Sequence, residues 1–484
     1  MDAKDKHEPD LPLRLLKRNF PHEPTQGQME FFRRMNDYLT VEASGGRIFL
    51  LKGYAGTGKT SLVSALVKTL PKIKLKSLLL APTGRAAKVM GNYSLRSAFT
   101  IHKIIYKPKG ELGDGGAGFV LQKNYSKNTV FIVDEASMIS DESFGGRSLL
   151  RDLIRFVLQE PSNSLVMVGD MAQLPPVGSS LSPGLDGGYL KRHFGLSVTE
   201  TELREVMRQQ LDSGILFNAT KLRNEMYQAK PAIRMQTLGF KDFYKMTGER
   251  LEDGLRYAYE KYGIEQAIVI TRSNKAAVQY NQYIRRSIHF HDDELAAGDF
   301  LMVVKNNYLY MAESERVSFI ANGDFVEIMK VRSFEEMYGF RFATLELRMV
   351  DYPDEPYFEA KVLLDTLYSD GPSLTSEQFR SLYQQVSADY ADVADKNERM
   401  ELIKKDSYLS ALQVKFAYAL TCHKAQGGQW EAVFVDQGYL TEEQVNSDFL
   451  RWLYTAMTRA RKELFMVNFH PRFYINYNET ENQT

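Results

Sequence analysis

The stretch GYAGTGKT, residues 53–60, constrains this chain more than any other. It follows the apolar run RIFLLK and precedes the amphipathic run SLVSALVKTL, an order that indicates strand, glycine-rich loop and helix. This is the G-x-x-x-x-G-K-[ST] pattern in the context it requires, where backbone N–H groups wrap a phosphate chain at a helix N-terminus. An ordinary glycine-rich turn is the competing interpretation, but both flanks argue against it. The pattern predicts nucleoside triphosphate contacts at Gly53, Tyr54, Ala55, Gly56, Thr57, Gly58, Lys59, Thr60 and Ser61.

A second apolar run, VFIVDEASM, carries two carboxylates to the end of another expected strand. Lys59 would neutralise the β- and γ-phosphates, while Thr60 and Asp134 would hold Mg²⁺. Glu135 would orient or deprotonate the attacking water. Alone, an Asp-Glu pair at a strand end is more often a helix cap or solvated charge. Together with the phosphate loop it predicts hydrolysis of the nucleoside triphosphate rather than binding alone.

Composition sets broad limits on the chain. Its 484 residues suggest about three domains. A hydrophobic fraction of 44% and a charged fraction of 25% are typical of a soluble globular protein. The single cysteine excludes a disulfide framework, and the charged start MDAKDKHEPD lacks the apolar core of a signal peptide, so a cytoplasmic location without membrane contact is expected. Because 61 basic residues balance 61 acidic ones, any nucleic-acid binding must come from local placement of charge.

The order of apolar runs predicts an α/β fold with an insertion. Short buried strands alternate with helices and loops through the first two hundred residues and return at QAIVITRS and EAVFVDQ. Between these two runs, residues 298–365 show a strand-and-turn pattern with Asn-Gly and Gly-Asp corners. Residues 373–405 then have a helical pattern that opens on an N-cap. We expect a small β-barrel and a helical arm inserted into a second α/β domain.

Seven further stretches, in order and at suitable spacing, resemble the motifs of superfamily 1 helicases of the RecD/Dda-like branch. They are PTQGQ (24–28), APTGRAAKVM (81–90), TIHKII (100–105), VGDMAQLPPV (168–177), LREVMRQ (203–209), LTCHKAQG (420–427) and LYTAMTRARKEL (453–464). The resemblance implies two RecA-like parallel-sheet domains, an SH3-like barrel with a helical arm, and a pin-like insertion. One departure is the short glycine-rich segment after Ile105, where relatives place a strand-separating hairpin.

The resemblance implies a division of the chain. An N-terminal extension would cover residues 1–23. The first RecA-like domain would cover residues 24–102 and 129–205, with the pin-like insertion at 103–128. The second RecA-like domain would cover residues 206–297 and 411–484, interrupted by the barrel and arm at 298–410.

The same resemblance implies roles at the nucleotide. Gln28 would contact the adenine edge, because an amide both donates and accepts. Gln173 would sense the γ-phosphate. Arg208 and Arg459 would neutralise charge in the transition state from the second domain. Without the motif, Arg208 would be taken for a solvated charge on a helix.

For nucleic acid, the resemblance implies phosphate contacts from both domains. The first domain would use Thr83, Arg85, Lys88, Thr100 and His102, and the second would use Thr421 and His423. Gly427 would let the backbone approach closely, and Gln426 would lie near the nucleotide cleft. Contacts to phosphate carry no sequence information, which suits a motor.

Cys422 raises a different possibility, because a cysteine beside a histidine can be a nucleophile with its base. Adjacent side chains on an extended strand point to opposite faces, however, and catalytic pairs normally meet across a fold. We therefore expect Cys422 to be a small buried apolar residue.

The implied activity is ATP-dependent unwinding with 5′-to-3′ movement on single-stranded DNA, using ATP and Mg²⁺. The implied partners are single-stranded DNA and duplex junctions, and the chain would act as a monomer. An RNA-directed helicase, a translocase that strips proteins without unwinding, and a binding subunit with a silent nucleotide site remain as alternatives.

Overall fold

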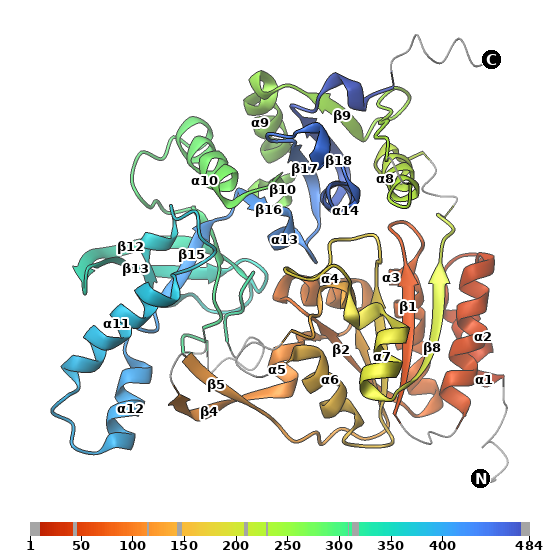
Figure 1. The fold of residues 1–484 in the computed structure, drawn as a ribbon, viewed down its shortest axis with the longest axis horizontal. Helices are drawn as coiled ribbons and strands as arrows, with labels where there is room; N and C mark the ends of the chain where they lie inside the picture. Colours follow the sequence, from red (N-terminus) through yellow and green to blue (C-terminus); the bar gives the residue numbers. More distant parts are fainter. Residues whose placement is uncertain are drawn as a thin grey trace.

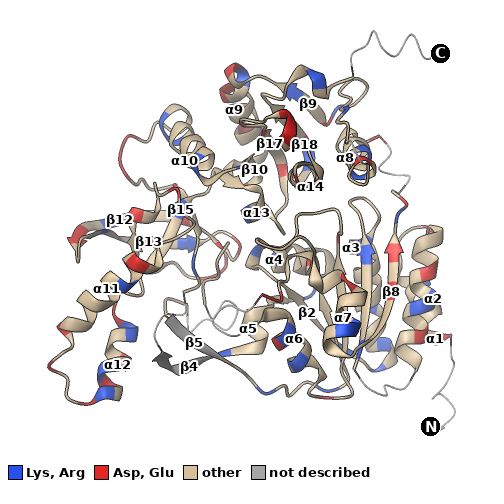
Figure 2. Ribbon diagram, viewed as in Figure 1, with Lys and Arg blue, Asp and Glu red and all other residues tan. Residues whose placement is uncertain are grey.

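The computed structural model describes residues 10–41, 46–113, 116–142, 148–207, 212–228, 231–307, 309–311 and 319–475. Two parallel sheets, a closed barrel and a two-stranded hairpin form its β-structure (Figure 1). Basic and acidic residues are interspersed along the described part of the ribbon (Figure 2), and the full sequence has a formal net charge of zero.

The first sheet has six parallel strands in the order β3-β2-β6-β7-β1-β8. Its strands are β1 (Arg47–Gly53), β2 (Lys76–Ala81), β3 (Ala98–Thr100), β6 (Thr129–Val133), β7 (Ser164–Gly169) and β8 (Ser197–Leu203). Because the strands are parallel, the carboxyl ends of β1, β6 and β7 meet at one edge of the sheet. This edge brings together segments that lie far apart in sequence.

Both faces of this sheet are covered, which explains the continuous apolar character of its strands. Along β1, Phe49 and Leu51 join one buried cluster, while Ile48 and Leu50 join another on the opposite face. The helices of the first face are α1 (Leu11–Asn19), α2 (Gln26–Thr40), α3 (Lys59–Thr69) and α4 (Gly84–Ser94), and those of the second are α5 (Ile101–Ile105), α6 (Leu149–Leu158) and α7 (Gly187–Phe194). Helix α1 falls in the expected N-terminal extension, yet its Leu16 is fully buried in the first cluster.

The second sheet has five parallel strands in the order β16-β10-β17-β18-β9. Its strands are β9 (Phe243–Met246), β10 (Ala267–Thr271), β16 (Ala419–Thr421), β17 (Trp430–Asp436) and β18 (Ala460–Val467). The helices around it are α8 (Gly214–Glu225), α9 (Leu251–Tyr262), α10 (Asn274–Tyr283), α13 (Cys422–Ala425) and α14 (Ser447–Met457). Helices α8 and α14 lie on the side that faces the first domain (Figure 1).

The barrel is inserted in the sequence between β10 and β16, which are neighbours in the second sheet. Its strands are β11 (Phe300–Val303), β12 (Phe325–Met337), β13 (Phe340–Met349), β14 (Phe358–Leu363) and β15 (Leu412–Phe416). The sequence division ends the insertion at residue 410, but β15 pairs with β11 and β14 and closes the barrel. An apolar run of five residues does not indicate which sheet the strand joins. The boundary at residue 410 is therefore wrong because it depends on strand pairing between distant parts of the sequence.

The helical arm consists of α11 (Ser376–Asp389) and α12 (Lys396–Lys405). It begins with a capping box in which Thr375 and Gln378 satisfy each other's backbone N–H groups. Leu382 and Val386 bury one face of α11 against Phe340 and Phe342 of the barrel.

The glycine-rich segment after Ile105 forms an antiparallel hairpin of β4 (Tyr106–Gly113) and β5 (Gly116–Leu121). The expected departure from the helicase pattern is thus smaller than the sequence suggests, because the hairpin is present. Helix α12 lies against β4, so the arm and the hairpin meet. Two parallel-sheet domains with an inserted barrel, helical arm and hairpin confirm the expected fold class.

Candidate active site and nucleic-acid interface

The phosphate loop connects β1 to α3 and needs glycine at two positions. Gly56 and Gly58 have φ of 77° and 85°, in the left-handed region that glycine favours. Lys59 begins α3, and its Nζ donates to the Tyr54 carbonyl at 2.9 Å. The Gly58 N-cap makes no side-chain hydrogen bond to the first turn, so the N–H groups of that turn have no capping side chain. Such a helix end is an anion-binding arrangement, which fits a phosphate chain.

Gln28 lies beneath this loop. It forms a capping box with Thr25 at the start of α2, and its Nε2 donates to the Thr57 carbonyl at 3.0 Å. A Cβ on Gly58 would come within 2.6 Å of that Nε2. Gln28 is almost fully buried, so here it supports the loop that would hold the nucleotide.

The end of β6 places the two acidic residues next to the loop. Asp134 uses both carboxylate oxygens, accepting from the Glu135 N–H at 2.8 Å and from the Tyr93 hydroxyl at 2.6 Å. Glu135 itself has φ of 51°, an uncommon conformation for a residue with a side chain. Burial raises the pKa of Glu135, with the charges of Asp134 and Asp170 adding to it, while Arg459 and Lys59 oppose the shift.

The second domain supplies a cation to the same place. Arg459 is 3% exposed, and its Nη1 lies 3.8 Å from Glu135 Oε1. Its Nε donates to the Thr455 carbonyl at 3.0 Å, which holds the guanidinium against the end of α14. Lys59, Glu135 and Arg459 therefore share one electrostatic environment, as the sequence motifs imply. Arg208 lies outside the described residues.

Helix α14 also contacts the first domain through neighbouring side chains. The Tyr454 hydroxyl accepts from the Ala55 N–H at 2.8 Å and donates to Asp170 Oδ2 at 2.7 Å. The Thr455 hydroxyl accepts from the Leu174 N–H at 2.8 Å. Sequence reasoning missed Tyr454, although it lies in the same motif as Arg459. The signal that could have identified Tyr454 is a polar aromatic residue in the otherwise apolar start of the motif LYTAMTRARKEL.

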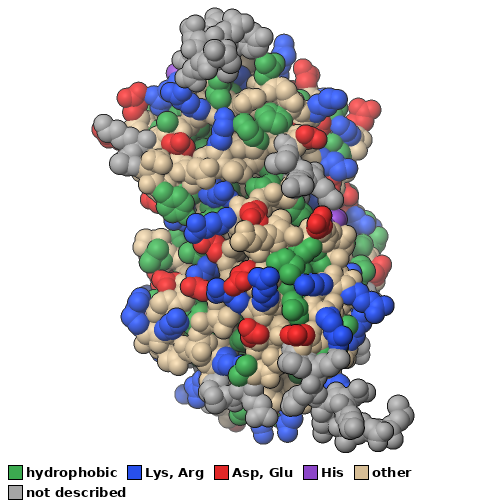
Figure 3. Space-filling model, turned by 90° about the vertical axis from the view of Figure 1, so that its right-hand side faces the viewer, with side chains coloured by type: hydrophobic (Ala, Val, Ile, Leu, Met, Phe, Trp, Pro, Cys, Tyr) green, Lys and Arg blue, Asp and Glu red, His purple; other side chains and the backbone are tan. Residues whose placement is uncertain are grey.

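Gln173 and Gln426, the two glutamines predicted to lie near the nucleotide, come from different domains and meet through Leu174. Gln426 donates from Nε2 to the Leu174 carbonyl at 2.8 Å, so it bonds to the residue next to Gln173. Gln173 is buried, and its Oε1 has no hydrogen-bond partner among the described residues. The outline of the molecule narrows between its upper and lower parts, at the level where the second parallel-sheet domain meets the first (Figure 3).

Three residues predicted to contact phosphate lie at the start of α4 or within it, and two of them contact other parts of the chain. Thr83 caps α4, accepting from the Ala86 N–H at 3.2 Å. The Arg85 guanidinium lies between two rings, 4.2 Å from the centre of Trp430 and 4.6 Å from that of Phe325. Lys88 forms an ion pair with the barrel residue Asp351 at 3.1 Å. In this structure, Arg85 and Lys88 thus join α4 to the second sheet and the barrel.

The remaining predicted residues lie at the starts of two short helices. Thr100 caps α5, and His102 in that helix is half-buried, which lowers the pKa of its imidazole. Thr421 precedes α13, and His423 is exposed within it. Gly427, with φ of 73°, approaches α4 so closely that a Cβ would lie 3.1 Å from Thr83 Oγ1.

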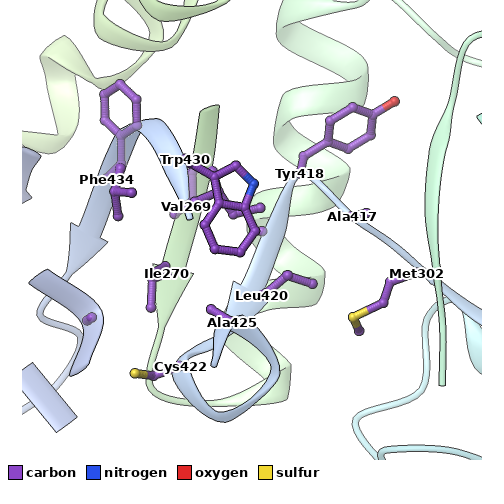
Figure 4. Packing of buried hydrophobic residues seen from close by; sticks show 14 of the residues in the cluster. Val269, Ile270, Met302, Ala417, Tyr418, Leu420, Cys422, Ala425, Trp430 and Phe434 are labelled. Atoms are coloured by element: carbon purple, nitrogen blue, oxygen red, sulfur yellow. The ribbon is translucent and has the colours of Figure 1, made fainter. Parts of the chain in front are cut away.

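Cys422 is buried, and its thiol donates to the Trp452 carbonyl at 3.5 Å. Burial raises the pKa of this thiol to about 12, so it stays protonated and is a poor nucleophile. Figure 4 shows it among apolar side chains that include Ile270 and Ala425. The prediction of a buried filler is confirmed.

Geometry and topology together define the class of protein. A phosphate loop, an Asp-Glu pair and an arginine from a second parallel-sheet domain make this a two-domain P-loop nucleotide-binding protein. Residues 34–236 match the family model of an AAA domain, and residues 416–467 match that of a UvrD-like helicase C-terminal domain. With the ordered motifs, these matches make the chain similar to superfamily 1 helicases of the RecD/Dda-like branch.

Individual relatives cover most of the chain at low identity. The ATP-dependent DNA helicase dda of Enterobacteria phage T4 is 24% identical over 445 residues, which span 86% of this chain and 93% of that protein. The ATP-dependent RecD2 DNA helicase of Deinococcus radiodurans is 23% identical over 435 residues, or 88% of this chain and 47% of that protein. A crystal structure of Pif1 helicase from Bacteroides in complex with ADP-AlF3 and ssDNA aligns over 95% of this chain and 96% of that chain, at 14% identity and a TM-score of 0.47.

Within the described part of the chain, no helix combines the length and apolar character needed to cross a membrane. The same residues hold no group of three or more His, Cys, Asp and Glu side chains that could bind a metal ion.

Proposed function

We propose that this chain is an ATP-dependent DNA helicase that moves 5′ to 3′ along single-stranded DNA. The observation that carries the proposal is that Glu135 lies 3.8 Å from Arg459 of the second domain and also within the electrostatic influence of Lys59 of the phosphate loop. Hydrolysis needs a cation on the phosphates, a base for water and a second cation for charge that develops in the transition state. These three groups come from two domains, so catalysis requires that the domains close on one nucleotide.

Each group has a defined task in this proposal. Lys59 holds the β- and γ-phosphates at the N-terminus of α3. Glu135 accepts a proton from the attacking water, and its raised pKa makes it a stronger base than an exposed carboxylate. Arg459 neutralises charge on the γ-phosphate oxygens. Asp134 and the hydroxyl of Thr60 are suited to hold Mg²⁺, which would neutralise phosphate charge when bound with ATP.

Coupling to nucleic acid rests on contacts that cross between the domains. Gln426 belongs to the same motif as Thr421 and His423, and it bonds to the segment that carries Gln173. A change in the separation of the domains would therefore move the nucleic-acid contacts and the nucleotide contacts together. We propose that Thr421 and His423 donate to phosphate oxygens from the second domain, with Thr100 and His102 on the first.

We propose that Thr83, Arg85 and Lys88 also reach phosphates, after Arg85 and Lys88 separate from their present partners in the barrel and second sheet. The domain division follows the one implied by the motifs, with β15 assigned to the barrel. The hairpin β4–β5 favours a helicase over a translocase that only strips proteins, because it provides an element against which a duplex can part. We further propose a monomeric protein that acts in the cytoplasm.

ATP turnover tests this function. We expect a low rate alone and strong stimulation by a single-stranded oligodeoxynucleotide. An oligoribonucleotide of the same length and sequence serves as the second arm, because an RNA-directed enzyme would prefer it. Equal turnover with and without either nucleic acid at saturating ATP would contradict the proposal.

A further inference from the structure

Arg223 on α8 makes a contact across the domains that the proposed cycle does not use. Its guanidinium carbon lies 4.1 Å from the centre of the Tyr54 ring, and Tyr54 belongs to the phosphate loop. Nη1 of Arg223 is buried and has no hydrogen-bond partner among the described residues. An unpaired buried donor is costly, and a stacked guanidinium is best stabilised where water is excluded. The stacking and the burial both indicate that Arg223 makes a specific contact with Tyr54 and is not a solvated surface charge.

Tyr54 transmits this contact to the catalytic lysine. Tyr54 is 8% exposed, and its hydroxyl donates to Glu202 Oε1 at 2.9 Å, so the side chain is held on two sides. Its carbonyl accepts from Lys59 Nζ at 2.9 Å and from the Thr57 hydroxyl at 2.8 Å. One residue therefore joins Arg223 of the second domain to the lysine of the first.

Helix α8 is also placed to report domain closure. It packs against α14, which carries Tyr454 and leads to Arg459. Burial raises the pKa of the Tyr454 hydroxyl, and the charge of Arg223 opposes that rise, so the two side chains share one region. A movement of the second domain would shift Arg223 and Arg459 together relative to the phosphate loop.

We propose that Arg223 is a positioning residue for ATP hydrolysis. By stacking on Tyr54 when the domains are closed, it fixes the loop conformation in which Lys59 meets the phosphates. It acts through Tyr54, and its unpaired nitrogen is available to an acceptor that arrives with the nucleotide. The inference rests on the proposed ATPase activity and adds a cross-domain contact to it.

The test measures DNA-stimulated ATP turnover against ATP concentration for Arg223→Met, Tyr54→Leu and the double variant. Loss of a desolvated cation–π contact predicts that each single change raises KM for ATP about tenfold. The double variant should also be near tenfold, because both changes remove one shared interaction. Arg250→Met, a change at an exposed arginine of the second domain, is the matched control and should match the wild type.

A purely structural role predicts a different pattern. It would lower thermal stability and the active fraction without changing KM, and it would leave the two changes additive. Additive effects near a hundredfold, or a KM equal to that of Arg250→Met, would overturn the inference. If Arg223→Met does not fold, Arg223→Lys replaces it, since lysine keeps the charge without the planar group that stacks. An inactive wild type would instead contradict the proposed function, so the two failures are distinguishable.

Discussion

Replacement of Asp324 by asparagine should strengthen the contact between the barrel and α4, and should do so more at high pH than at low pH. Asp324 precedes β12, is 3% exposed, and accepts from the Ala321 N–H at 2.7 Å. Its Oδ1 has no hydrogen-bond partner among the described residues, and a Cβ on Gly84 would collide with it. Burial raises the pKa of this carboxyl to about 7, and the charge of nearby Asp351 adds to the shift.

The direction of the pH effect follows from linkage. The folded protein holds this proton more tightly than the unfolded chain, whose aspartate has a pKa near 3.9. Folded stability is therefore unaffected below about pH 4, falls as pH rises to about 7, and is constant above that. A shift of about three units corresponds to roughly 4 kcal/mol at full ionisation. Asparagine avoids that cost and can still accept from the Ala321 N–H, but it buries an NH2 group that lacks a partner, at about 1–3 kcal/mol.

The cost of burying the asparagine amide is the same at every pH. It therefore cancels when the stability difference between Asp324→Asn and the wild type is compared at two pH values. Between pH 5.5 and 8, the advantage of Asp324→Asn over the wild type should grow by roughly 2 kcal/mol. Urea unfolding of the transition that exposes the barrel, followed at both pH values, measures it. Asp392→Asn, at an exposed aspartate between α11 and α12, is the control and should show no such growth. An advantage for Asp324→Asn that is the same at both pH values would refute the reasoning.

Two further pairs of changes test the assigned roles. Lys59→Ala and Glu135→Gln should both abolish ATP turnover. A labelled-nucleotide titration should show weakened binding only for Lys59→Ala, because the glutamine variant keeps the phosphate contacts. An equal loss of nucleotide binding in both variants would argue against the assignment. Cys422→Ser should keep most activity and lose at most about 1–3 kcal/mol of stability from burying a hydroxyl, whereas His423→Ala should raise the DNA concentration for half-maximal ATPase and leave the DNA-free rate unchanged. A folded but inactive serine variant would contradict the role given to this motif.

The parts predicted well from sequence are those in which local pattern decides structure. In the phosphate loop, the glycines, the lysine and the flanking runs all lie within about twenty residues, and each has a local physical reason. The N-cap expected at the start of the helical pattern is Thr375, and its partner Gln378 lies only three residues away. Local agreement of this kind leaves few alternatives for the backbone.

The parts that sequence could not supply depend on distant partners. The motif predicts that Arg85 and Lys88 contact nucleic acid. In the structure, Arg85 stacks on Trp430, and Lys88 forms an ion pair with Asp351. Lys88 and Asp351 are separated by 263 residues, so no local pattern connects them. Tyr454 stands out only as a polar aromatic in an apolar run, and its partners Ala55 and Asp170 lie in another domain, so the sequence could not show what it contacts.

Directional unwinding tests the central claim most directly. Duplexes of equal length and sequence, carrying a single-stranded tail at either the 5′ or the 3′ end, are incubated with the protein, ATP and Mg²⁺, and strand separation is followed by fluorescence. The account predicts ATP-dependent separation of the 5′-tailed duplex and little or none of the 3′-tailed one, with loss of separation in Glu135→Gln. Separation of the 3′-tailed duplex in preference to the 5′-tailed one, or separation that does not require ATP, would contradict it.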